Sequence, residues 1–483
     1  MSDTAISIRT GTLSRVTLSL NETSLTVQTP SKSKDTIHHD IPHRNILRAS
    51  LGSNPLKLTV AFLEKKKKKT THLAIVEGDI EESEVVHATQ WAESVMKAAY
   101  ESLGVKPFRR LMVFVNPFGG TKKGAAIFTK KIAPIFEIAG CSLDVLYTTH
   151  QGQAQEIAKK LPLDFDAVIT VSGDGLIHEI LNGFAEHAEP SKALATPIAP
   201  IPTGSGNGLS LNLLGIKDGF DVVVAALNAI KGEPMKVDLF SVTQGGKRTI
   251  SFMSQAVGLM ADLDIGTENL RWMGDTRFMY GLLRGLIKFK PCPVQLSFKV
   301  AENDKDKMAA TVYSIKKDKT PSIPPSSAAS ETSFHDKLPS LKFLDGNEED
   351  WTTFDEPILY VYAGKGPYVG RDFMAFPVSL PNDGLIDVMA MSKTSRGDIL
   401  TAMDGANQGE CFWHPKVHYV KAHAYRIKPL KKKGHLAVDG EPYPFEEFQV
   451  EVHEGLGTFL SPFGHYAAMF EPRTRSGVAH KHH

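Results

Sequence analysis

Three glycine-rich stretches, each directly after a short apolar run, constrain the fold of this chain most strongly. They read VNPFGGTKKG at 115–124, VSGDG at 171–175 and IPTGSGNGLS at 201–210. Strand-like and helix-like runs alternate around them from about 110 to 232. Such alternation is typical of βαβ crossovers in a largely parallel sheet, where ligands bind beyond the carboxyl ends of the strands. We therefore predict an α/β domain over 105–235, with all three stretches at one edge of its sheet.

The flanking regions show strand patterns instead of this alternation. Residues 1–104 contain alternating runs such as RVTLSL and LKLTVAFL, and they end in an amphipathic run around Trp91. Antiparallel strands closed by one helix predict a small β module that resembles a pleckstrin-homology-like domain. Residues 236–465 predict a β-rich domain, followed by a tail at 466–483. Within that domain 302–355 is rich in Lys, Ser and Pro, and we expect a disordered insertion there.

Composition narrows the functional classes. The 483 residues include 55 basic and 54 acidic side chains, a net charge of +1, which gives no reason to expect nucleic acid as a partner. Cys141, Cys292 and Cys411 are widely spaced and fit a reducing compartment better than a disulfide framework. Neither a signal-like N-terminus nor about 18 consecutive apolar residues occur, so we expect a cytoplasmic protein that meets membranes peripherally. The lysines at 65–69 suit either anionic headgroups or a solvated loop.

The glycine-rich stretches indicate a phosphate site when they are taken together. Glycine lets backbone N–H groups approach a ligand closely, and the N-terminus of the following helix favours negative charge. A single glycine-rich turn is common in α/β proteins and needs no ligand. Neither GxxxxGK[ST] nor GxGxxG after the first strand is present, so neither a P-loop nor a dinucleotide fingerprint explains the pattern.

Five motifs carry a family resemblance. NPFGGTKKG, SGDGLIHEILNGF, PTGSGNGLS, DGLIDV and AVDGE follow one another between 109 and 461. They resemble those of the diacylglycerol-kinase-type lipid kinases, and among these the sphingosine, or sphingoid long-chain-base, kinases. The resemblance implies a nucleotide-binding α/β domain, a β-sandwich lipid-binding domain, and ATP with Mg²⁺ between them. It also implies phosphorylation of the primary hydroxyl of sphingosine, dihydrosphingosine or phytosphingosine. GGTKKG departs from the commoner GGKGK-like spacing, which leaves any role for Lys122 and Lys123 open.

Asp174 is the candidate catalytic base. Phosphoryl transfer to an alcohol needs a proton acceptor near the hydroxyl, and Asp174 matches the position of the family's base. The alternative is a carboxylate that caps the helix beginning there. The resemblance further implies that Ser172, Gly173, Gly175 and Asp264 contact the lipid substrate.

The resemblance also implies a set of nucleotide contacts. They are Asn116, Pro117, Phe118, Gly119, Gly120, Thr148, Glu179, Gly204, Ser205, Gly206, Arg271, Arg277, Asp439, Gly440 and Glu441. Asp439 is implied to order Mg²⁺ through water, a role that suits this ion's preference for oxygen ligands and retained waters. A plain hairpin turn is the alternative for Asp439 to Glu441. Asn207 is expected to orient the third glycine-rich loop.

The segment after residue 257 bears on the substrate. Asp264 and Arg271 are seven residues apart, two turns of a helix, so both can face one cleft. A carboxylate suits the amine of a sphingoid base, whereas ceramide and diacylglycerol carry no such charge. Asp262 is the competing carboxylate, and helix-start charge is the alternative reading of the pair. The apolar residues that suit either a lipid-tail pocket or a core are Leu259, Met260, Phe278, Met279, Leu282, Leu283, Leu286 and Phe289.

The sequence therefore leaves four candidate functions. The first is a sphingoid-base kinase, and the second is a ceramide or diacylglycerol kinase. The third is an NAD kinase, whose related fold also carries a Gly-Asp-Gly turn, although DGLIDV and the segment around Asp264 favour a lipid acceptor. The fourth is an inactive lipid-binding adaptor, against which the complete set of catalytic motifs argues.

Overall fold

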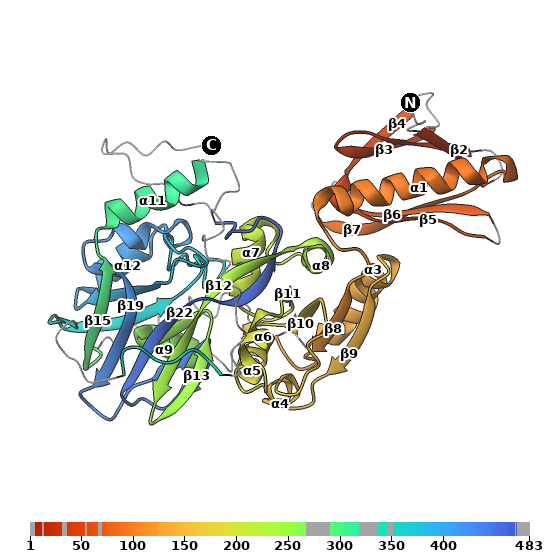
Figure 1. The fold of residues 1–483 in the computed structure, drawn as a ribbon. Coiled ribbons are helices and arrows are strands. Elements are labelled where there is room, and N and C mark those ends of the chain that lie inside the picture. The colour runs from red at the N-terminus through yellow and green to blue at the C-terminus, as the bar shows by residue number, and fades with distance from the viewer. Residues whose placement is uncertain are drawn as a thin grey trace.

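A computed structural model describes most of the chain. The described residues are 5–11, 14–30, 36–53, 56–65, 70–120, 122–266, 290–317, 337–344, 351–468 and 470. Figure 1 shows three regions in chain order: a small β module, an α/β domain, and a β-rich domain. None of the helices in these ranges combines the length and the apolar character needed to cross a bilayer.

The N-terminal module is an antiparallel sheet covered by one helix. Its strands are β1 (Ala5–Thr10), β2 (Ser14–Leu20), β3 (Ser24–Pro30), β4 (Thr36–Pro42), β5 (Ile46–Leu51), β6 (Lys57–Lys65) and β7 (Thr71–Asp79). They lie in the order β4-β3-β2-β1-β7-β6-β5. Helix α1 (Val85–Ala99) lies across the strands and buries Trp91 and Val95, whereas Val86 is exposed (Figure 1). The predicted order of strands followed by one helix is confirmed.

The α/β domain has the predicted parallel sheet. Strands β8 (Arg110–Val115), β9 (Ser142–Tyr147), β10 (Ala167–Ser172) and β11 (Ile198–Pro202) pair in the order β11-β10-β8-β9. The helices are α2 (Gly124–Ile127), α3 (Ala133–Ile138), α4 (Gln153–Ala158), α5 (Asp174–Ala185), α6 (Pro190–Ala195), α7 (Gly208–Asp218) and α8 (Val222–Lys231). A π-helical segment, η4 (Phe128–Ile132), joins α2 to α3, and Pro134 lies in the first turn of α3, where a missing N–H is tolerated.

The β-rich domain continues the same sheet. Its strands are β12 (Glu233–Gln244), β13 (Lys247–Ser251), β14 (Ser254–Gly258), β15 (Val294–Glu302), β16 (Thr352–Phe354), β17 (Ile358–Gly364), β18 (Ile386–Ser392), β19 (Val417–Pro429), β20 (Leu436–Val438), β21 (Glu441–Tyr443) and β22 (Phe448–Ser461). Its helices are α9 (Leu259–Gly266), α11 (Lys305–Lys317) and α12 (Arg396–Met403). Strand β22 pairs with β12 and also reaches β11 at Ile198 and Phe459. The predicted domain boundary at 235 therefore falls inside β12.

Parts of the predicted disordered insertion are ordered. Helix α11 buries Met308 and Val312, and two backbone N–H groups of the segment 337–344 donate to the Glu451 carboxylate. The expectation of disorder over 302–355 is therefore wrong for these parts. The four-residue spacing of Met308 and Val312 was the signal for a helix, hidden among many lysines. The rest of the insertion lies outside the described residues, apart from its ends and strand β16.

The predicted tail at 466–483 is also packed where it begins. Tyr466 and Phe470 are buried, and Phe470 stacks on Trp413. The boundary of the β-rich domain at 465 is therefore a few residues too early.

Candidate active site

The three glycine-rich loops meet at one edge of the parallel sheet, as predicted. A Cβ atom on Gly204 would lie 2.3 Å from the Cα atom of Gly173, and one on Gly120 would lie 2.4 Å from the carbonyl oxygen of Thr203. Real Cβ atoms do not approach backbone so closely, so these loops contact one another only because the positions are glycine. Together the three loops form a surface at which backbone atoms of glycine, without side chains, are close to one another.

The first loop is shaped by Asn116. Its Oδ1 atom accepts the N–H groups of Phe118 at 2.9 Å and Gly119 at 3.0 Å. This bonding is typical of an Asx turn, in which the side chain folds the backbone back on itself. Lys122 and Lys123 are exposed, and neither lines the cavity described below.

The third loop is held by Asn207, which confirms its expected orienting role. Its side chain accepts the N–H of Gly204 and donates to the carbonyl of the same residue, both at 2.9 Å. Asn207 itself has a φ of 54°, in the left-handed region that asparagine tolerates. Helix α7 begins at the next residue, so this loop fixes where the N-terminus of α7 points.

Asp174 lies opposite that helix N-terminus. Its carboxylate accepts the N–H of Gly208 at 2.7 Å and of Leu209 at 3.2 Å, the first two residues of α7. Asp174 is the first residue of α5, but it caps α7, so the predicted alternative of a cap on its own helix does not describe it. Burial raises the pKa of Asp174 to about 6, which the two N–H groups oppose and the charge of Asp439 reinforces. Near neutral pH such a carboxylate can accept a proton and release it again.

Asp439 is a buried carboxylate on the turn between β20 and β21. It accepts hydrogen bonds from the Ser251 hydroxyl at 2.8 Å, from three successive backbone N–H groups at 252–254, and from Nδ1 of His178 at 2.8 Å. Five donors saturate a carboxylate, so direct coordination of a metal ion would displace at least one of them. The implied contact with Mg²⁺ through water stays a prediction.

Two glutamates complete the acidic lining. A Cβ atom on Gly175 would lie 3.0 Å from Oε1 of Glu441, so Glu441 lies against the start of α5. Its Oε2 atom accepts from Gln151 at 3.1 Å. Glu179 accepts the N–H of Ala154 at 3.2 Å, near the start of α4. The α/β domain and the β-rich domain thus both contribute carboxylates.

One cavity of about 430 Å³ collects most of the predicted residues. The predicted residues that line it are Asn116, Phe118, Gly119, Gly120, Thr148, Ser172, Gly173, Asp174, Gly175, Glu179, Gly204, Ser205, Gly206, Asp439, Gly440 and Glu441. Within the described part of the chain its charged lining consists of carboxylates, without lysine or arginine. A polyanion in this cavity would therefore need backbone N–H groups, cations from elsewhere, or a bound divalent ion.

The remaining predicted residues are not brought into this cavity. Pro117 does not line it. Asp264 belongs to α9, but its side chain lies outside what the structure describes, and so do Arg271 and Arg277. Asp262, the competing carboxylate, is exposed and lies 2.5 Å from Nδ1 of His435. Asp262 thus faces the surface.

Sequence reasoning missed several lining residues. They are His150, Gln151, Leu176, Met253, Ser254, Tyr362 and Val369. His178 also received no role, although its four-residue spacing from Asp174 puts both on one face of a helix. Ser254 and Tyr362 lie on strands of the β-rich domain and Met253 on the turn just before β14, and nothing in their local sequence marks them.

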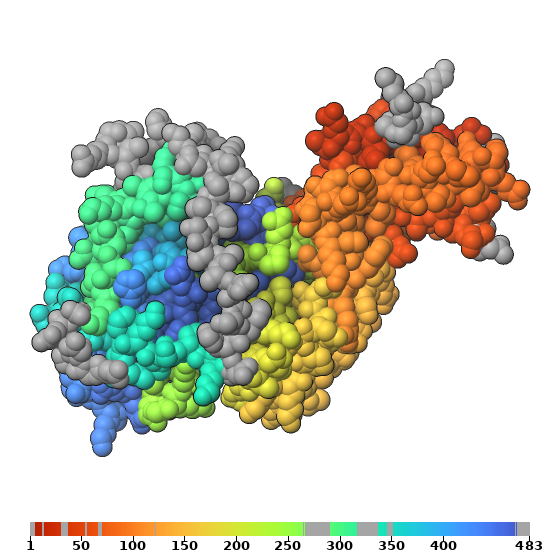
Figure 2. Space-filling model, viewed as in Figure 1, coloured from red at the N-terminus to blue at the C-terminus, as the bar shows by residue number. Residues whose placement is uncertain are grey.

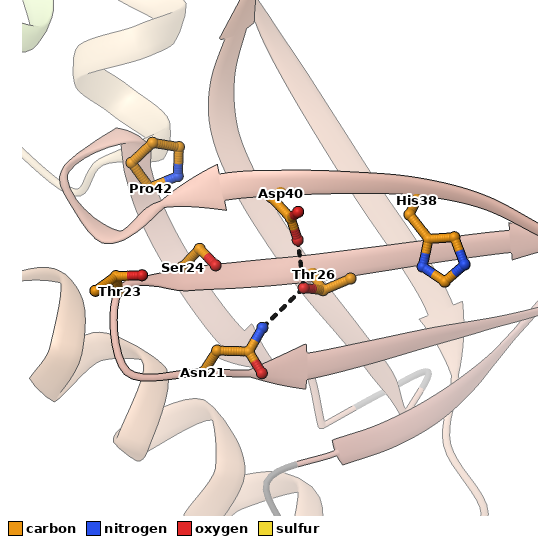
Figure 3. A pocket seen from close by; sticks show the side chains of 7 residues that line it. All are labelled: Asn21, Thr23, Ser24, Thr26, His38, Asp40 and Pro42. Carbon is orange, nitrogen blue, oxygen red and sulfur yellow. Dashed lines mark hydrogen bonds between the residues drawn. The ribbon is translucent and has the colours of Figure 1, made fainter.

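A second cavity lies in the N-terminal module (Figure 3). It measures about 820 Å³ and is lined by Asn21, Thr23, Ser24, Thr26, His38, Asp40 and Pro42. The Thr26 hydroxyl donates to Asp40 at 2.5 Å and accepts from Asn21 at 2.8 Å, so these polar groups bond to one another. None of the predicted site residues lines it, so the candidate site is the smaller cavity between the two larger domains.

Three family models match consecutive parts of the chain. The diacylglycerol kinase catalytic domain matches residues 110–242, and a YegS C-terminal NAD kinase beta sandwich-like domain matches 333–456. A domain of unknown function matches 9–101. The first range spans the α/β domain and most of β12, the second lies in the β-rich domain, and the third lies in the N-terminal module.

Curated relatives extend over most of the chain. Sphingoid long chain base kinase 4 of Schizosaccharomyces pombe is 32% identical over 428 residues, which cover 88% of this chain and 88% of the relative. Sphingosine kinase 1 of Arabidopsis thaliana is 29% identical and covers 73% of this chain and 76% of its own. Human sphingosine kinase 1 is 27% identical and covers 71% and 88%.

A solved structure shares the fold. The crystal structure of a diacylglycerol kinase from Bacillus anthracis superposes with a TM-score of 0.50 and 20% identity, covering 74% of this chain and 98% of that one. At this identity the likeness concerns the fold alone.

Proposed function

Because the chain belongs to the family of sphingoid long-chain-base kinases, we propose that it transfers the γ-phosphoryl group of ATP to the primary hydroxyl of a sphingoid base. One observation carries this proposal: Asp174, with a pKa near neutrality, faces a cavity walled by three bare-backbone loops. Such loops suit phosphates, and such a carboxylate suits a hydroxyl.

Asp174 acts as the base in this proposal. As the bond between the acceptor oxygen and the γ-phosphorus forms, the O–H bond breaks and Asp174 takes the proton, while ADP leaves. The N–H groups of Gly208 and Leu209 orient the carboxylate and favour its charged form. Burial keeps its pKa high enough that the proton is held strongly once it is taken.

The glycine-rich loops hold the nucleotide in this proposal. The N–H groups of Gly119 and Gly204 already donate to Asn116 and Asn207, so phosphate oxygens would meet the neighbouring backbone of these loops, where glycine leaves no side chain in between. The acidic lining of the described cavity fits a magnesium-bound nucleotide, since four carboxylates and a bare triphosphate would repel one another. Glu441 directly and Asp439 through water are the residues that would hold Mg²⁺, which offsets the charge of the phosphates when bound.

The lipid contacts rest on family resemblance. Asp264 is assigned to the amine of the sphingoid base, while Arg271 and Arg277 are assigned to the phosphates of the nucleotide. The acceptor is a membrane lipid, so the proposal includes peripheral contact of a cytoplasmic enzyme with a membrane surface.

Phosphate transfer to a panel of acceptors tests this function. Labelled Mg·ATP is offered with dihydrosphingosine, ceramide, diacylglycerol and NAD, using the unmodified protein, Asp174→Asn and Asp264→Asn. We expect labelling of the free base, a loss of about 10³-fold in Asp174→Asn, and a raised KM for the base in Asp264→Asn. Labelling of ceramide or diacylglycerol instead would overturn the role of Asp264. Lipid binding without any transfer would instead support the adaptor.

A further inference from the structure

Helix α5 carries a polar stripe, of which His178 and Asn182 face the β-rich domain. Asp174, His178 and Asn182 are four residues apart and lie on one face of the helix. Asn182 accepts the N–H of Ile250 and donates to its carbonyl, both at 2.8 Å. The helix that begins with the candidate base is thus bonded to strand β13 of the other domain.

His178 bridges the same two domains inside the cavity wall. Its Nδ1 atom lies 2.8 Å from the Asp439 carboxylate, and its Nε2 atom lies 3.2 Å from the Tyr443 hydroxyl. A carboxylate only accepts, so Nδ1 carries a proton and donates to Asp439, while Nε2 lies within hydrogen-bond distance of the Tyr443 hydroxyl. His178 is 7% exposed, so water does not compete for these bonds.

Asp439, the residue that His178 contacts, has an uncommon backbone conformation. Asp439 has a φ of 51°, a left-handed conformation that is uncommon for a residue other than glycine. Of its five described donors, four belong to the β-rich domain, and His178 alone comes from the α/β domain. Glu441, two residues further on, places its Oε1 atom beside Gly175 of α5.

We propose that His178 is a positioning residue for the phosphoryl transfer. It ties the turn Asp439–Glu441, which bears the carboxylates assigned to the nucleotide and its metal, to the helix whose first residue is Asp174. The bond between His178 and Asp439 thus sets the distance between the nucleotide and the base. This inference rests on the proposed function, because it assumes that nucleotide and acceptor meet between these two elements.

Three variants test the inference. His178→Ala removes the bridge, and His178→Asn keeps a donor where Nδ1 lies. Asn228→Ala is the matched control, since Asn228 is a buried residue of α8 that donates to the Leu460 carbonyl at 2.8 Å and does not line the cavity. For each we would measure thermal unfolding, calorimetric binding of a non-hydrolysable ATP analogue with Mg²⁺, and kcat and KM for both substrates.

The expected result separates positioning from stability. His178→Ala should weaken binding of the analogue and lower kcat/KM for Mg·ATP by about tenfold or more, with less than about a twofold change in KM for dihydrosphingosine. His178→Asn should recover to within about threefold of the unmodified protein. Asn228→Ala should lower the unfolding temperature without either kinetic change.

Two results would overturn the inference. One is that His178→Ala changes only the unfolding temperature, as the control does, and the other is that His178→Asn is no better than His178→Ala. If His178→Ala does not fold, His178→Asn and Tyr443→Phe are compared with the unmodified protein instead. We expect both variants to bind the ATP analogue nearly normally. A loss of this binding in His178→Asn would refute the bridge. If the unmodified protein phosphorylates nothing, the proposed function fails, while binding of the analogue still reports on His178.

Discussion

The α/β domain is joined to its two neighbours by different kinds of contact. Its interface with the N-terminal module is a continuous apolar core around one buried lysine, although Figure 2 shows the module projecting as a separate lobe. Its interface with the β-rich domain includes side-chain amides that bond to backbone, and it encloses the candidate active site. That apolar core also includes Ile250, Phe252 and Phe459 of the β-rich domain, so the two interfaces share apolar packing. They differ in their polar contacts: a buried lysine at the module interface, and paired amides beside the candidate site.

Lys231 is the polar centre of the module interface. Its side chain is 0% exposed, and its Nζ atom donates to the carbonyls of His43, Ile46 and Ala99, with distances of 3.2 Å and 2.9 Å for the first and last. It also lies 4.2 Å from the ring centroid of Tyr100. Burial lowers the pKa of Lys231 to about 7, but three carbonyl acceptors require the three protons of the ammonium form.

The other interface uses amides in pairs. Asn182 bonds both backbone groups of Ile250, and Asn212 of α7 bonds both backbone groups of Tyr368, at 2.7 Å and 2.9 Å. Each amide imitates the pairing of a neighbouring strand, so it fixes position without any charge. These amides belong to α5, which carries Asp174, and to α7, whose first two N–H groups donate to Asp174.

The largest expected effect is on stability, from Lys231→Met. The substitution removes the ammonium group that donates to the carbonyls of His43, Ile46 and Ala99, of which only that of His43 is shown to accept a second N–H, from Ile46. We therefore expect a loss of about 3–5 kcal/mol in the free energy of unfolding. Urea unfolding measures this loss, with the exposed Lys217→Met as control. At a temperature where the variant is folded, its kcat/KM should equal that of the unmodified protein. A loss below about 1 kcal/mol would mean that Lys231 does not stabilise the module interface as described.

A smaller loss of stability, joined to a loss of activity, is expected from Asn212→Ala. It leaves the buried N–H and carbonyl of Tyr368 unpaired, at about 2 kcal/mol. Because α7 also orients Asp174, kcat should fall several-fold at a temperature where the protein is folded. Urea unfolding and steady-state kinetics measure the two effects. If Lys231→Met and Asn212→Ala reduced kcat equally at matched stability, the two interfaces would not differ in the way we describe.

Acidification should lower activity, whereas the Asp174 carboxyl should stabilise the fold as the pH falls. Asp174 must be ionised to accept a proton, so kcat/KM should fall about tenfold per pH unit below its pKa of about 6. Burial raises this pKa above its ordinary value, so the folded state holds the proton more tightly than the unfolded state does. This carboxyl therefore favours the folded state as the pH falls through 6 and disfavours it above 6. Between pH 8 and pH 5, kcat/KM should fall while the contribution of this carboxyl to the free energy of unfolding does not. A parallel loss of activity and stability would contradict this.

The sequence predicted those parts of the fold and of the candidate site that local pattern controls. The parallel strands are short apolar runs, and the glycine loops follow them directly, so convergence at one sheet edge follows from topology. Asn207 was expected to orient its loop, and it adopts a left-handed conformation that asparagine tolerates. Met308 and Val312 are spaced as on one face of a helix, but the many lysines around them led to a prediction of disorder.

The rest depends on contacts between distant segments. Asp174 was predicted as a base or as a cap of its own helix, but the N–H groups it accepts belong to α7, 34 residues further on. In the sequence, Lys231 looks like an ordinary cation at a helix C-terminus. Its burial comes from the N-terminal module that packs against it. Asn182 and His178 occur in a recognised motif, yet their partners, Ile250 and Asp439, are 68 and 261 residues away. No local pattern encodes such pairs.

The smallest expected effect comes from the rim of the module interface. Lys65 lies 2.7 Å from Asp218 at the end of α7, but both side chains are partly exposed, so Lys65→Ala should cost at most about 0.5 kcal/mol and nothing at high salt. Asp221 nearby accepts the N–H of Thr71 at 3.2 Å and caps α8, so Asp221→Ala should cost about 1 kcal/mol at any salt concentration. Urea unfolding at low and high salt separates the two. A large, salt-sensitive loss in Lys65→Ala would mean that surface charge, and not the core around Lys231, holds the module in place.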